Sequence, residues 1–467
     1  MSTTLHSRGH FIAGDEVPAA SGATFESLDP TNGEPIATLA RGSAEDVDRA
    51  VAAARAAFPA WRDVDPYARG RILQRLADLV EAHADDLAEV ESRDAGKPHG
   101  DAVREVDRVV RTFTYYAGWP TKITGTTNPA DPGVFSYTLR EPVGVVGAIT
   151  PWNFPAVIAA WKLAPALACG NAVVHKPAEE SPLSALLLAE LAREAGIPPG
   201  VWNVVTGDAE AGAALVAHDD VDKVSFTGST AVGREIQRSA AGNLKRLTLE
   251  LGGKSANVVL DDADLDAAVE GAMRATFRNQ GQVCTAGARL VAHASLADEL
   301  AERVAERVRG LEPGPLISAR QREHVLELYG AATDEGARAL VGGGALDRPG
   351  FFVEPTVFVD TTNEMRINRE EIFGPAVAVI RAGDAEEAVR IANDTPYGLA
   401  AAVWTRDASR AHLIARALNA GTVWINNYGG LDVYSAYGGR GLSGYGYEQG
   451  PQTIEEYTTL KTVRQTL

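Results

Sequence analysis

Four short apolar runs between residues 143 and 228 constrain the fold more than any other feature of this sequence. The runs are VGVVGAI (143–149), NAVVHK (171–176), VWNVV (201–205) and KVSFTG (223–228). Their length and composition are typical of strands that are buried on both faces of a sheet. The segment after the second run predicts a helix with Ser181 as N-cap, Pro182 at its first position and Gly196 after its end. Strands that alternate with helices predict a parallel, doubly wound α/β sheet.

A second alternating region begins near Leu251, where further apolar runs are again followed by helical patterns. The first hundred residues are mostly helical in pattern instead, and one of these helices opens with a capping box formed by Ser43 and Asp46. We therefore expect two α/β units and a helical cover that precedes them.

Charge and composition exclude several classes of partner. The 467 residues include 44 basic and 62 acidic side chains, which gives a net charge of −18 and disfavours nucleic acid and anionic lipid. No segment approaches the roughly 20 apolar residues that span a bilayer. The start of the chain lacks the pattern of a secretory signal, so we expect a cytoplasmic protein without a structural disulfide. No metal site is predicted.

The two cysteines stand in different surroundings. Cys169 is flanked by alanine, leucine and proline, which favours a packed thiol. Cys284 lies in FRNQGQVCTAG (277–287), among small and amide residues that leave room for a substrate. A catalytic sulfur needs access and a stabilised thiolate. The local pattern leaves nucleophile and packed thiol equally open for Cys284.

Two further residues allow a catalytic and a structural interpretation. Glu250 ends an apolar strand before two glycines, where burial would raise its pKa toward the range of a general base. Alternatively, its carboxylate pairs with Lys254 or a backbone donor. Asn153, between a strand and a helix, is either the N-cap of that helix or a donor to a developing oxyanion.

Two segments after strands suit parts of a dinucleotide. Gly228 and Gly233 enclose a turn into a helix, whose N-terminus favours phosphate, although the spacing alone is a weak signal. Lys176 and Glu179 follow another strand and could bind ribose hydroxyls, with the carboxylate repelling a 2′-phosphate. A solvated charged turn is the alternative for this pair.

Taken together and in order, these motifs resemble the aldehyde dehydrogenase superfamily. The matching segments are TPWNFP (150–155), KPAEESP (176–182), FTGSTAVG (226–233), LELGGKS (249–255), FRNQGQVCTAG (277–287), EEIFGP (370–375) and GGRGLSGYG (438–446). The resemblance extends from about residue 27 to residue 463, nearly the whole chain. Arginine, leucine and tyrosine in the last segment depart from the pattern of many relatives, which puts the tunnel mouth or a subunit contact in question.

The resemblance implies a division of the chain and an assembly. Residues 1–123 and 143–252 would form an NAD-binding domain, and residues 253–442 a catalytic domain. Residues 124–142 and 443–467 would form a small β oligomerisation element, in which a protruding hairpin and a last strand that pairs with a neighbour's sheet build a homodimer or homotetramer.

The resemblance also implies the site. Cys284 would be the nucleophile, Glu250 the hydrolytic base, and the Asn153 amide with the Cys284 backbone NH the oxyanion hole. NAD, rather than NADP, would be the cofactor, because Glu179 would face its adenosine ribose. The implied cofactor-binding residues are Ile149, Thr150, Pro151, Trp152, Lys176, Glu179, Gly207, Phe226, Thr227, Gly228, Ser229, Gly233, Leu251, Gly252, Glu371 and Phe373.

By the same resemblance, an apolar and aromatic tunnel leads to the sulfur. Its implied residues are Tyr115, Tyr116, Trp161, Val283, Thr285, Leu431 and Tyr434. No arginine is evidently placed for a substrate carboxylate, so we expect a medium-sized aliphatic or aromatic aldehyde rather than an anionic semialdehyde. Aromatic residues could also hold the quaternary ammonium of betaine aldehyde.

Two rival functions follow from the same family. One is acyl transfer to coenzyme A or reduction of an acyl phosphate, which Glu250 disfavours because coenzyme A-acylating relatives generally lack that base. The other is a non-catalytic protein that kept the fold, which the presence of Cys284 disfavours.

Overall fold

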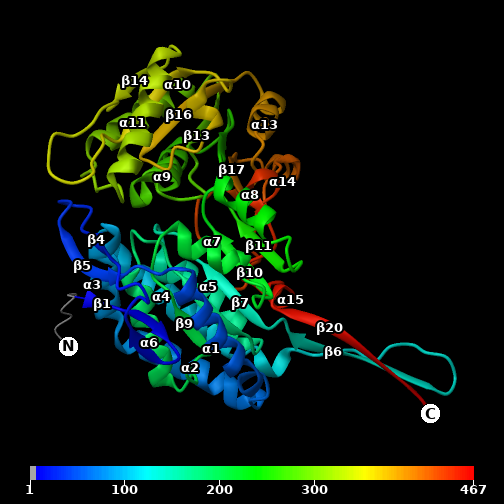
Figure 1. Ribbon diagram of the computed structural model, residues 1–467. Coiled ribbons are helices and arrows are strands. Elements are labelled where there is room, and N and C mark those ends of the chain that lie inside the picture. Colours follow the sequence, from blue (N-terminus) through cyan, green and yellow to red (C-terminus); the bar gives the residue numbers. More distant parts are fainter. Residues whose placement is uncertain (1–6) are drawn as a thin grey trace.

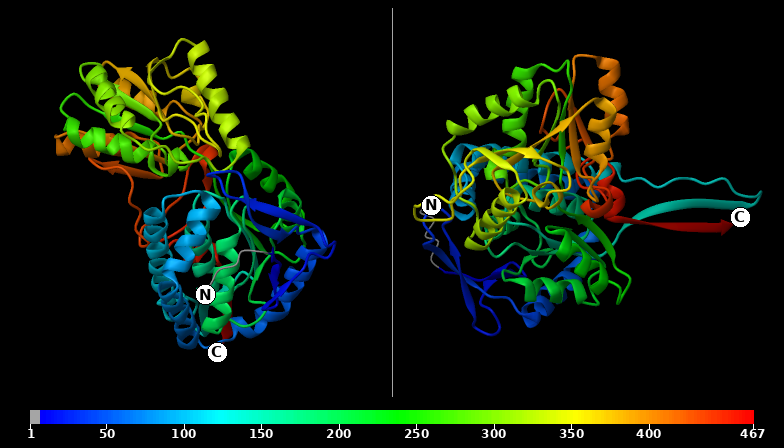
Figure 2. Two further views of the ribbon diagram at one scale, coloured as in Figure 1. Left: turned by 90° about the vertical axis from the view of Figure 1, so that its left-hand side faces the viewer. Right: turned by 90° about the horizontal axis from the view of Figure 1, so that it is seen from above.

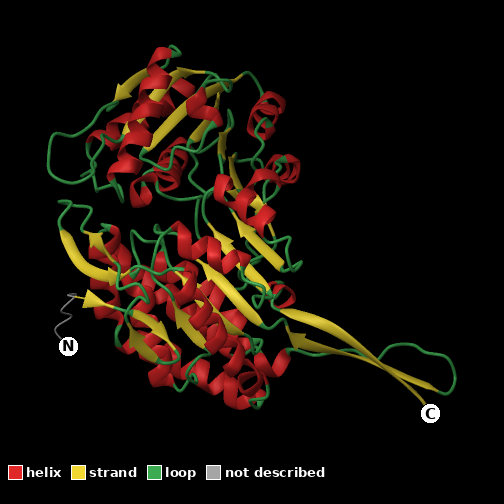
Figure 3. Cartoon of the chain, in the orientation of Figure 1, coloured by secondary structure: helices red, strands yellow, loops and turns green. Residues whose placement is uncertain are grey.

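The computed structural model describes residues 7–467 and contains two α/β lobes and a projecting β arm (Figure 1). The first lobe is built on an eight-stranded sheet and the second lobe on a seven-stranded sheet. Figure 3 shows helices on both sides of the strands in each lobe. This arrangement confirms the predicted α/β class with two alternating units.

The strands of the first lobe include all four apolar runs of the sequence. In sheet order they are β19 (Gly444–Tyr445), β11 (Arg246–Glu250), β10 (Lys223–Thr227), β7 (Val145–Ile149), β8 (Ala172–Lys176), β9 (Trp202–Val204), β2 (His10–Ile12) and β3 (Asp15–Val17). The five strands from β11 to β9 are parallel, and the edge strands pair antiparallel. A three-stranded sheet, β1 (Ser7–Arg8), β5 (Pro35–Ala40) and β4 (Thr24–Leu28), adjoins this lobe.

Helices cover both faces of the eight-stranded sheet. They are α1 (Ala44–Arg62), α2 (Pro66–Ala82), α3 (Ala84–Ala95), α4 (His99–Ala117), α5 (Pro155–Ala168), α6 (Leu183–Ala195), α7 (Ala209–Ala217) and α8 (Thr230–Ser239). Alternate residues of β7 face opposite ways, so that Val146 and Ala148 join the core with α5 and α6 while Val145 and Ile149 join the core with α1, α7 and α8. The two faces are thus sealed by separate apolar cores.

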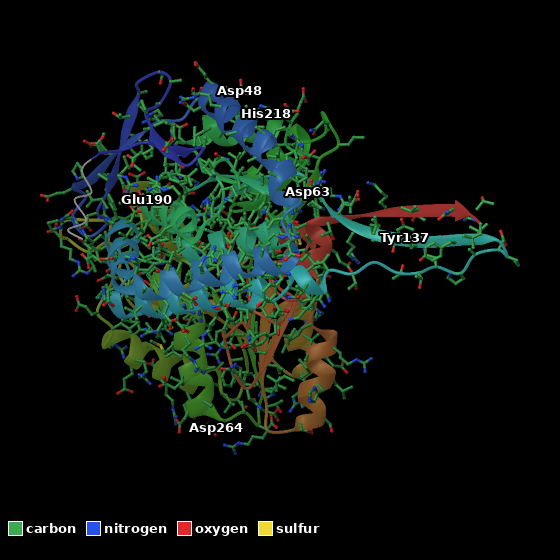
Figure 4. The ribbon with its side chains drawn as sticks, turned by 90° about the horizontal axis from the view of Figure 1, so that it is seen from below. Asp48, Asp63, Tyr137, Glu190, His218 and Asp264 are labelled. Carbon is green, nitrogen blue, oxygen red and sulfur yellow. The ribbon has the colours of Figure 1, made fainter. Side chains whose placement is uncertain are left out.

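The structure confirms the predicted capping box of α1 but not the predicted start of α6. Ser43 and Asp46 form that box. On the same helix, Asp48 lies 3.2 Å from the ring of His218 after α7, and Figure 4 shows both. Helix α6 begins at Leu183 with Pro182 in the N-cap position, one residue later than predicted. Ser181 is not the N-cap because its hydroxyl donates to the Trp152 carbonyl at 3.1 Å.

The second lobe repeats the layered plan. In sheet order its strands are β14 (Arg338–Val341), β15 (Thr356–Thr361), β16 (Ala376–Ala382), β13 (Arg289–His293), β12 (Ala256–Val259), β17 (Ala400–Trp404) and β18 (Thr422–Ile425). Its helices are α9 (Leu265–Thr276), α10 (Ala297–Arg309), α11 (Ala319–Asp334), α12 (Arg366–Arg369), α13 (Ala385–Asn393) and α14 (Ala408–Ala417). Helices α9 and α10 cover one face, and α11, α13 and α14 cover the other.

The arm is a two-stranded antiparallel ribbon that leaves the body of the first lobe (Figure 2). Strand β6 (Val134–Pro142) pairs along its whole length with β20 (Thr458–Thr466), and Figure 4 shows Tyr137 on the ribbon away from the lobes. The last strand therefore pairs through one edge with β6 of its own chain, and the expected pairing with a neighbour's sheet, which would use a second edge, stays a prediction. The helix α15 (Thr453–Glu456) precedes this strand.

Residues 443–467 are not confined to the arm, because β19 pairs with β11 at the edge of the eight-stranded sheet. Within residues 7–467, no helix combines the length and apolar character that a membrane crossing requires. The same residues contain no group of three or more His, Cys, Asp or Glu side chains arranged to hold a metal ion.

Candidate active site

The strand order of the first lobe reverses at β7, which is the point where a doubly wound sheet has its ligand crevice. Strands β8 and β9 follow β7 on one side, whereas the chain returns to place β10 on the other side of β7. In doubly wound sheets ligands bind outside the carboxyl ends of the strands at such a point. Ile149 at the end of β7 is paired in register with Lys176 of β8 and with Phe226 of β10. The topology therefore brings the predicted cofactor residues of these three strands to one edge.

Helix α8 begins directly behind this edge. Ser229 is its N-cap and accepts a hydrogen bond from the Val232 backbone at 3.3 Å. The hydroxyl of Thr227, at the end of β10, is buried and has no hydrogen-bond partner among residues 7–467. A helix N-terminus and an unpartnered hydroxyl suit the phosphate of a cofactor.

The predicted glycines permit close packing as well. A Cβ atom on Gly228 would lie 2.4 Å from the Phe226 ring, and one on Gly233 would lie 2.6 Å from Leu251. The second contact explains how α8 approaches β11 so closely. Gly207 has a φ of +147° and packs on the backbone of Gly42, so its requirement for glycine is structural.

The remaining predicted cofactor residues form two pairs. The Lys176 ammonium lies 3.3 Å from the Glu179 carboxylate at the end of β8. Between the lobes, Glu371 accepts a hydrogen bond from the Gly253 backbone at 3.0 Å and occupies the space beside Gly252, where a Cβ atom would lie 2.1 Å from the carboxylate. Burial raises the pKa of Glu371 to about 7.

The aromatic residues near Glu371 form an edge-to-face pair. The ring centroids of Trp152 and Phe373 are 5.2 Å apart, with an interplanar angle of 87°. Phe373 has a φ of +52°, a conformation that a bulky residue adopts only when its surroundings impose it. The strained backbone thus holds this ring against the segment that follows β7.

The loop that carries Cys284 turns sharply after α9. The short helix η2 (Arg278–Gly281) contains two residues with left-handed backbone, Asn279 and Gln280, followed by Gly281 at a φ of +72°. The Asn279 amide donates to the Asn153 carbonyl at 3.2 Å, which ties this loop to the segment after β7. The loop therefore joins the second lobe to the crevice of the first.

Asn153 lies beside the loop that carries Cys284 and is not a helix cap. Helix α5 begins at Pro155 with Phe154 in the N-cap position. The Asn153 amide nitrogen instead donates to the Gln282 carbonyl at 2.9 Å, two residues before Cys284. An amide NH2 has two hydrogens. The second hydrogen is the one that could serve an oxyanion.

Cys284 is half-buried and its sulfur lies 3.2 Å from the Tyr437 hydroxyl. Burial raises the pKa of the Cys284 thiol to about 12, the Tyr437 hydroxyl lowers it, and the negative charges of Glu371 and Glu250 raise it further. Desolvation thus opposes ionisation of this thiol more strongly than the Tyr437 hydroxyl favours it. Cys169 is buried in the core, as predicted.

Glu250 ends β11 with its carboxylate buried and unpaired. The residue is 2% exposed, and neither carboxylate oxygen has a hydrogen-bond partner among residues 7–467. Burial raises its pKa well above the ordinary value, and the negative charge of Glu448 adds to this effect. The predicted alternative, a pair with Lys254, does not form because the Lys254 ammonium is itself without a hydrogen-bond partner in the described chain.

Three residues near Glu250 were not identified from the sequence. Lys162 and Glu448 form a buried ion pair, and the Ser225 hydroxyl donates to the same Glu448 oxygen at 3.1 Å. The positive charge of Lys162 lowers the pKa of Glu250, and so opposes the effect of Glu448. Lys162 lies on α5 and Glu448 near the C-terminus, so no local sequence pattern links them.

The predicted tunnel residues are brought together only in part. The rings of Tyr115 and Tyr434 lie 5.5 Å apart, and those of Trp161 and Tyr437 lie 5.3 Å apart. Leu431 is half-buried on the loop before Tyr434. Tyr116 is a correction to the tunnel prediction, because its side chain is in the hydrophobic core and its hydroxyl donates to the Gly450 carbonyl at 3.0 Å.

Arginine side chains line a cavity near the cysteine loop. Val283 and Thr285, which flank Cys284, line this cavity of about 490 Å³. The same cavity is lined by four arginines, Arg104, Arg108, Arg274 and Arg278. Neither Cys284 nor the aromatic residues of the predicted tunnel line it, so the expectation that no arginine is placed for a substrate carboxylate stays a prediction. Two features of the sequence could have pointed to this cavity. Arg104 and Arg108 lie at helical spacing on α4, and Arg278 lies within the cysteine motif.

Fold and site place the chain among two-sheet α/β proteins with a ligand crevice at the switch point of one sheet. A family model described as "Aldehyde dehydrogenase family" matches residues 17–463, so the chain belongs to that family. It is 48% identical to the human mitochondrial aldehyde dehydrogenase, over 97% of this chain and 91% of that protein. It is 47% identical to the mitochondrial benzaldehyde dehydrogenase of Antirrhinum majus, over 97% of this chain and 88% of that protein.

A solved structure agrees with the sequence comparison. The NAD+ complex of an aldehyde dehydrogenase from Bacillus cereus superimposes with a TM-score of 0.97 at 43% sequence identity. The match covers 99% of this chain and 97% of that chain. The predicted family and fold are thereby confirmed.

Proposed function

We propose that this protein oxidises an aldehyde to a carboxylic acid with NAD as hydride acceptor, through a thioester on Cys284. The observation that carries the proposal is that three residues far apart in the sequence, Cys284, Asn153 and Glu250, lie on segments that contact one another. Cys284 contacts Tyr437, the Asn153 amide bonds two residues before Cys284, and the neighbouring Gly438 lies beside the Glu250 carboxylate. A nucleophile, an oxyanion donor and a base are the groups that acyl chemistry requires.

The chemistry follows from these positions. The Cys284 thiol loses its proton to solvent as its sulfur bonds to the carbonyl carbon, and the resulting alkoxide accepts hydrogen bonds from Asn153 and the Cys284 backbone NH. Bound NAD would supply the hydride acceptor. Loss of the hydride from the former carbonyl carbon leaves a thioester on Cys284. Glu250 then takes a proton from water, whose oxygen attacks the thioester carbon while the carbon–sulfur bond breaks. The acid and the Cys284 thiolate are the products of this step.

The proposed cofactor fits the residues that would hold it. The start of α8 and the unpartnered Thr227 hydroxyl suit the pyrophosphate, and the Lys176–Glu179 pair suits the adenosine ribose. The Glu179 carboxylate would repel the 2′-phosphate of NADP. The NAD+ complex of the Bacillus cereus relative supports the choice of NAD.

We propose that the two lobes have different roles. The first lobe would bind NAD and the second lobe would carry the nucleophile, as the domain prediction states. Residues 443–445 are the exception, because they complete the edge of the first sheet. We further propose that the protein is cytoplasmic and that it forms a homodimer or homotetramer. The assembly is supported by exposed apolar residues along the arm, namely Phe135, Leu139 and Leu460.

The proposed substrate has a medium-sized aliphatic or aromatic body, supported by the aromatic side chains near the sulfur. The rings of Trp161 and Tyr437 adjoin Cys284, and those of Tyr115 and Tyr434 lie further along the predicted tunnel. Betaine aldehyde is the second candidate because aromatic faces attract a quaternary ammonium. The four arginines of the neighbouring cavity oppose that candidate.

One incubation separates hydrolytic oxidation from acyl transfer to coenzyme A. The purified protein is mixed with NAD and hexanal in the absence of coenzyme A and phosphate. We expect NADH and hexanoic acid in equal amounts over many turnovers, since Glu250 supplies the base for hydrolysis. Absence of the acid, with NADH appearing only after coenzyme A is added, would overturn the hydrolytic assignment.

The Tyr437 hydroxyl gives a separate prediction. The Tyr437 hydroxyl lies 3.2 Å from the Cys284 sulfur and is the donor of this contact whenever the sulfur is a thiolate. Tyr437→Phe should therefore slow alkylation of Cys284 by iodoacetamide at pH 8 by about 2-fold to 10-fold, the value of one hydrogen bond. The matched control is Tyr434→Phe, which removes a hydroxyl from a residue that is 65% exposed. Equal alkylation rates in the Tyr437→Phe variant and the parent would show that the contact does not stabilise the thiolate.

A further inference from the structure

The arginine cavity is a positively charged exception on an acidic protein. It encloses about 490 Å³ beside Val283 and Thr285, the two neighbours of Cys284. Four guanidinium groups and only one carboxylate, Asp101, line it, although the whole chain carries a net charge of −18. Local charge of this kind attracts anions that the rest of the surface repels.

Two of the four arginines lack a counter-ion within the protein. Among residues 7–467, Arg108 and Arg274 have no carboxylate within 4.0 Å, and Arg274 bonds only to the Asn427 side chain at 3.3 Å. Arg104, by contrast, pairs with Asp101. The cavity therefore contains guanidinium groups that are free to bind a ligand.

The positive charge of Arg278 is only weakly neutralised by its neighbours. Its guanidinium lies 3.8 Å from Glu105, whose carboxylate is already paired with Lys97 at 2.6 Å. Arg108 and Arg278 line the same cavity. Burial and the positive charge of Arg278 lower the pKa of Arg108, although the negative charges of Glu105 and Asp107 raise it. Like charges held together in a half-buried space are stabilised when an anion enters.

We propose that the aldehyde substrate carries a carboxylate at its far end, and that Arg108, Arg274 and Arg278 bind it. The inference rests on the proposed function, because Cys284 must react with the aldehyde at the other end. A carboxylate suits these residues because the planar guanidinium group donates two parallel hydrogen bonds to it. The aromatic residues beside the sulfur would then enclose the carbon chain between the two ends.

The proposal changes the expected order of substrates. An ω-oxo acid is favoured over the neutral aldehyde of similar length, and betaine aldehyde is disfavoured because its ammonium meets like charge. The chain length of the acid is set by the path from the sulfur to the arginines, so a series of lengths should show an optimum.

The test compares matched acids and esters on the full-length protein. Values of kcat/KM are measured with NAD for 4-oxobutanoate, 6-oxohexanoate and 8-oxooctanoate, and for the methyl ester of each. Variants Arg108→Gln and Arg278→Gln remove the charge with little change in length. Arg390→Gln on α13 is the control because this exposed arginine does not line the cavity.

We expect at least one acid to exceed its ester by about 10-fold or more in the parent protein. Each cavity variant should lose about 10-fold to 100-fold on that acid, since a hydrogen bond to a charged group is removed, and should lose much less on the ester, which carries no charge at that end. The control variant should match the parent on both. Retained ester oxidation also shows that a variant is folded.

Equal kcat/KM values for every acid and its ester, or equal losses on both in the variants, would overturn the carboxylate assignment. In that case oxidation of the esters still supports the proposed dehydrogenase function. Failure to oxidise any aldehyde with NAD would instead reject the proposed function itself, so the two failures are distinguishable.

Discussion

Replacement of Cys284 by serine should reduce NADH production by at least about 10³-fold, the scale on which loss of a catalytic nucleophile is felt. A hydroxyl is a much weaker nucleophile than a thiolate at neutral pH, and no described group is placed to activate it. The Tyr437 hydroxyl lies 3.2 Å from the Cys284 sulfur, but burial raises its pKa well above the ordinary value, so it stays protonated and cannot act as a base. Steady-state absorbance of NADH with hexanal as substrate measures the effect.

The second cysteine provides the matched control for this substitution. Cys169 is buried in the core of the first lobe, and burial raises the pKa of its thiol to about 12. Cys169→Ser should keep its turnover even if its stability falls. Full oxidation by Cys284→Ser, or equal inactivation by the two substitutions, would refute Cys284 as the nucleophile.

Glu250→Gln should separate hydride transfer from hydrolysis. Glutamine keeps the volume of the buried side chain but cannot accept the proton of water, so the thioester should persist. We expect a rapid burst of about one NADH per subunit and then turnover slowed by about 10² to 10⁴-fold, the usual contribution of a general base. Stopped-flow absorbance measures the burst, and the exposed Glu302→Gln serves as control.

The pH dependence of the parent protein should follow the same residue. Burial raises the pKa of Glu250 well above its ordinary value, and only the ionised carboxylate acts as a base. Hydrolysis should therefore be fast above that pKa and fall as the pH is lowered through it. Steady-state turnover of Glu250→Gln should lack this limb. A parent-like limb in the variant would assign the titration to another group, such as Glu371, whose pKa burial raises to about 7.

Much of the fold could be predicted from the sequence because its signals are local. The runs that became β7, β8, β9 and β10 are apolar on both faces, and only a parallel sheet covered on both sides buries them. The start of α6 was missed by one residue because Ser181 bonds to the Trp152 carbonyl, a partner distant in the sequence.

The candidate site was predictable where its residues lie at the ends of strands. Glu250 ends β11 and Asn153 follows β7, and the sheet order places both strand ends at the same edge of the sheet. The roles of Tyr437, Lys162 and Glu448 depend on contacts between segments more than 150 residues apart, which no local pattern records. Tyr116 was misplaced because its helix face turns into the core.

The substrate end of the site was the least predictable part. Arg108 and Arg278 come from different lobes, so their common cavity follows only from the packing of α4 beside the loop after α9. Each arginine alone is indistinguishable in sequence from a solvated surface charge. The position of these arginines around one cavity, rather than their residue type, indicates an anionic ligand.

The most direct test of the account is the mass of the enzyme during turnover. Glu250→Gln is mixed with NAD and hexanal, quenched in acid after the burst and digested, and the peptide that contains Cys284 is weighed. The account predicts that this peptide carries one hexanoyl group, in an amount equal to the NADH formed, and that hydroxylamine removes it. NADH formed while the Cys284 peptide stays unmodified would contradict an acyl-enzyme on this sulfur.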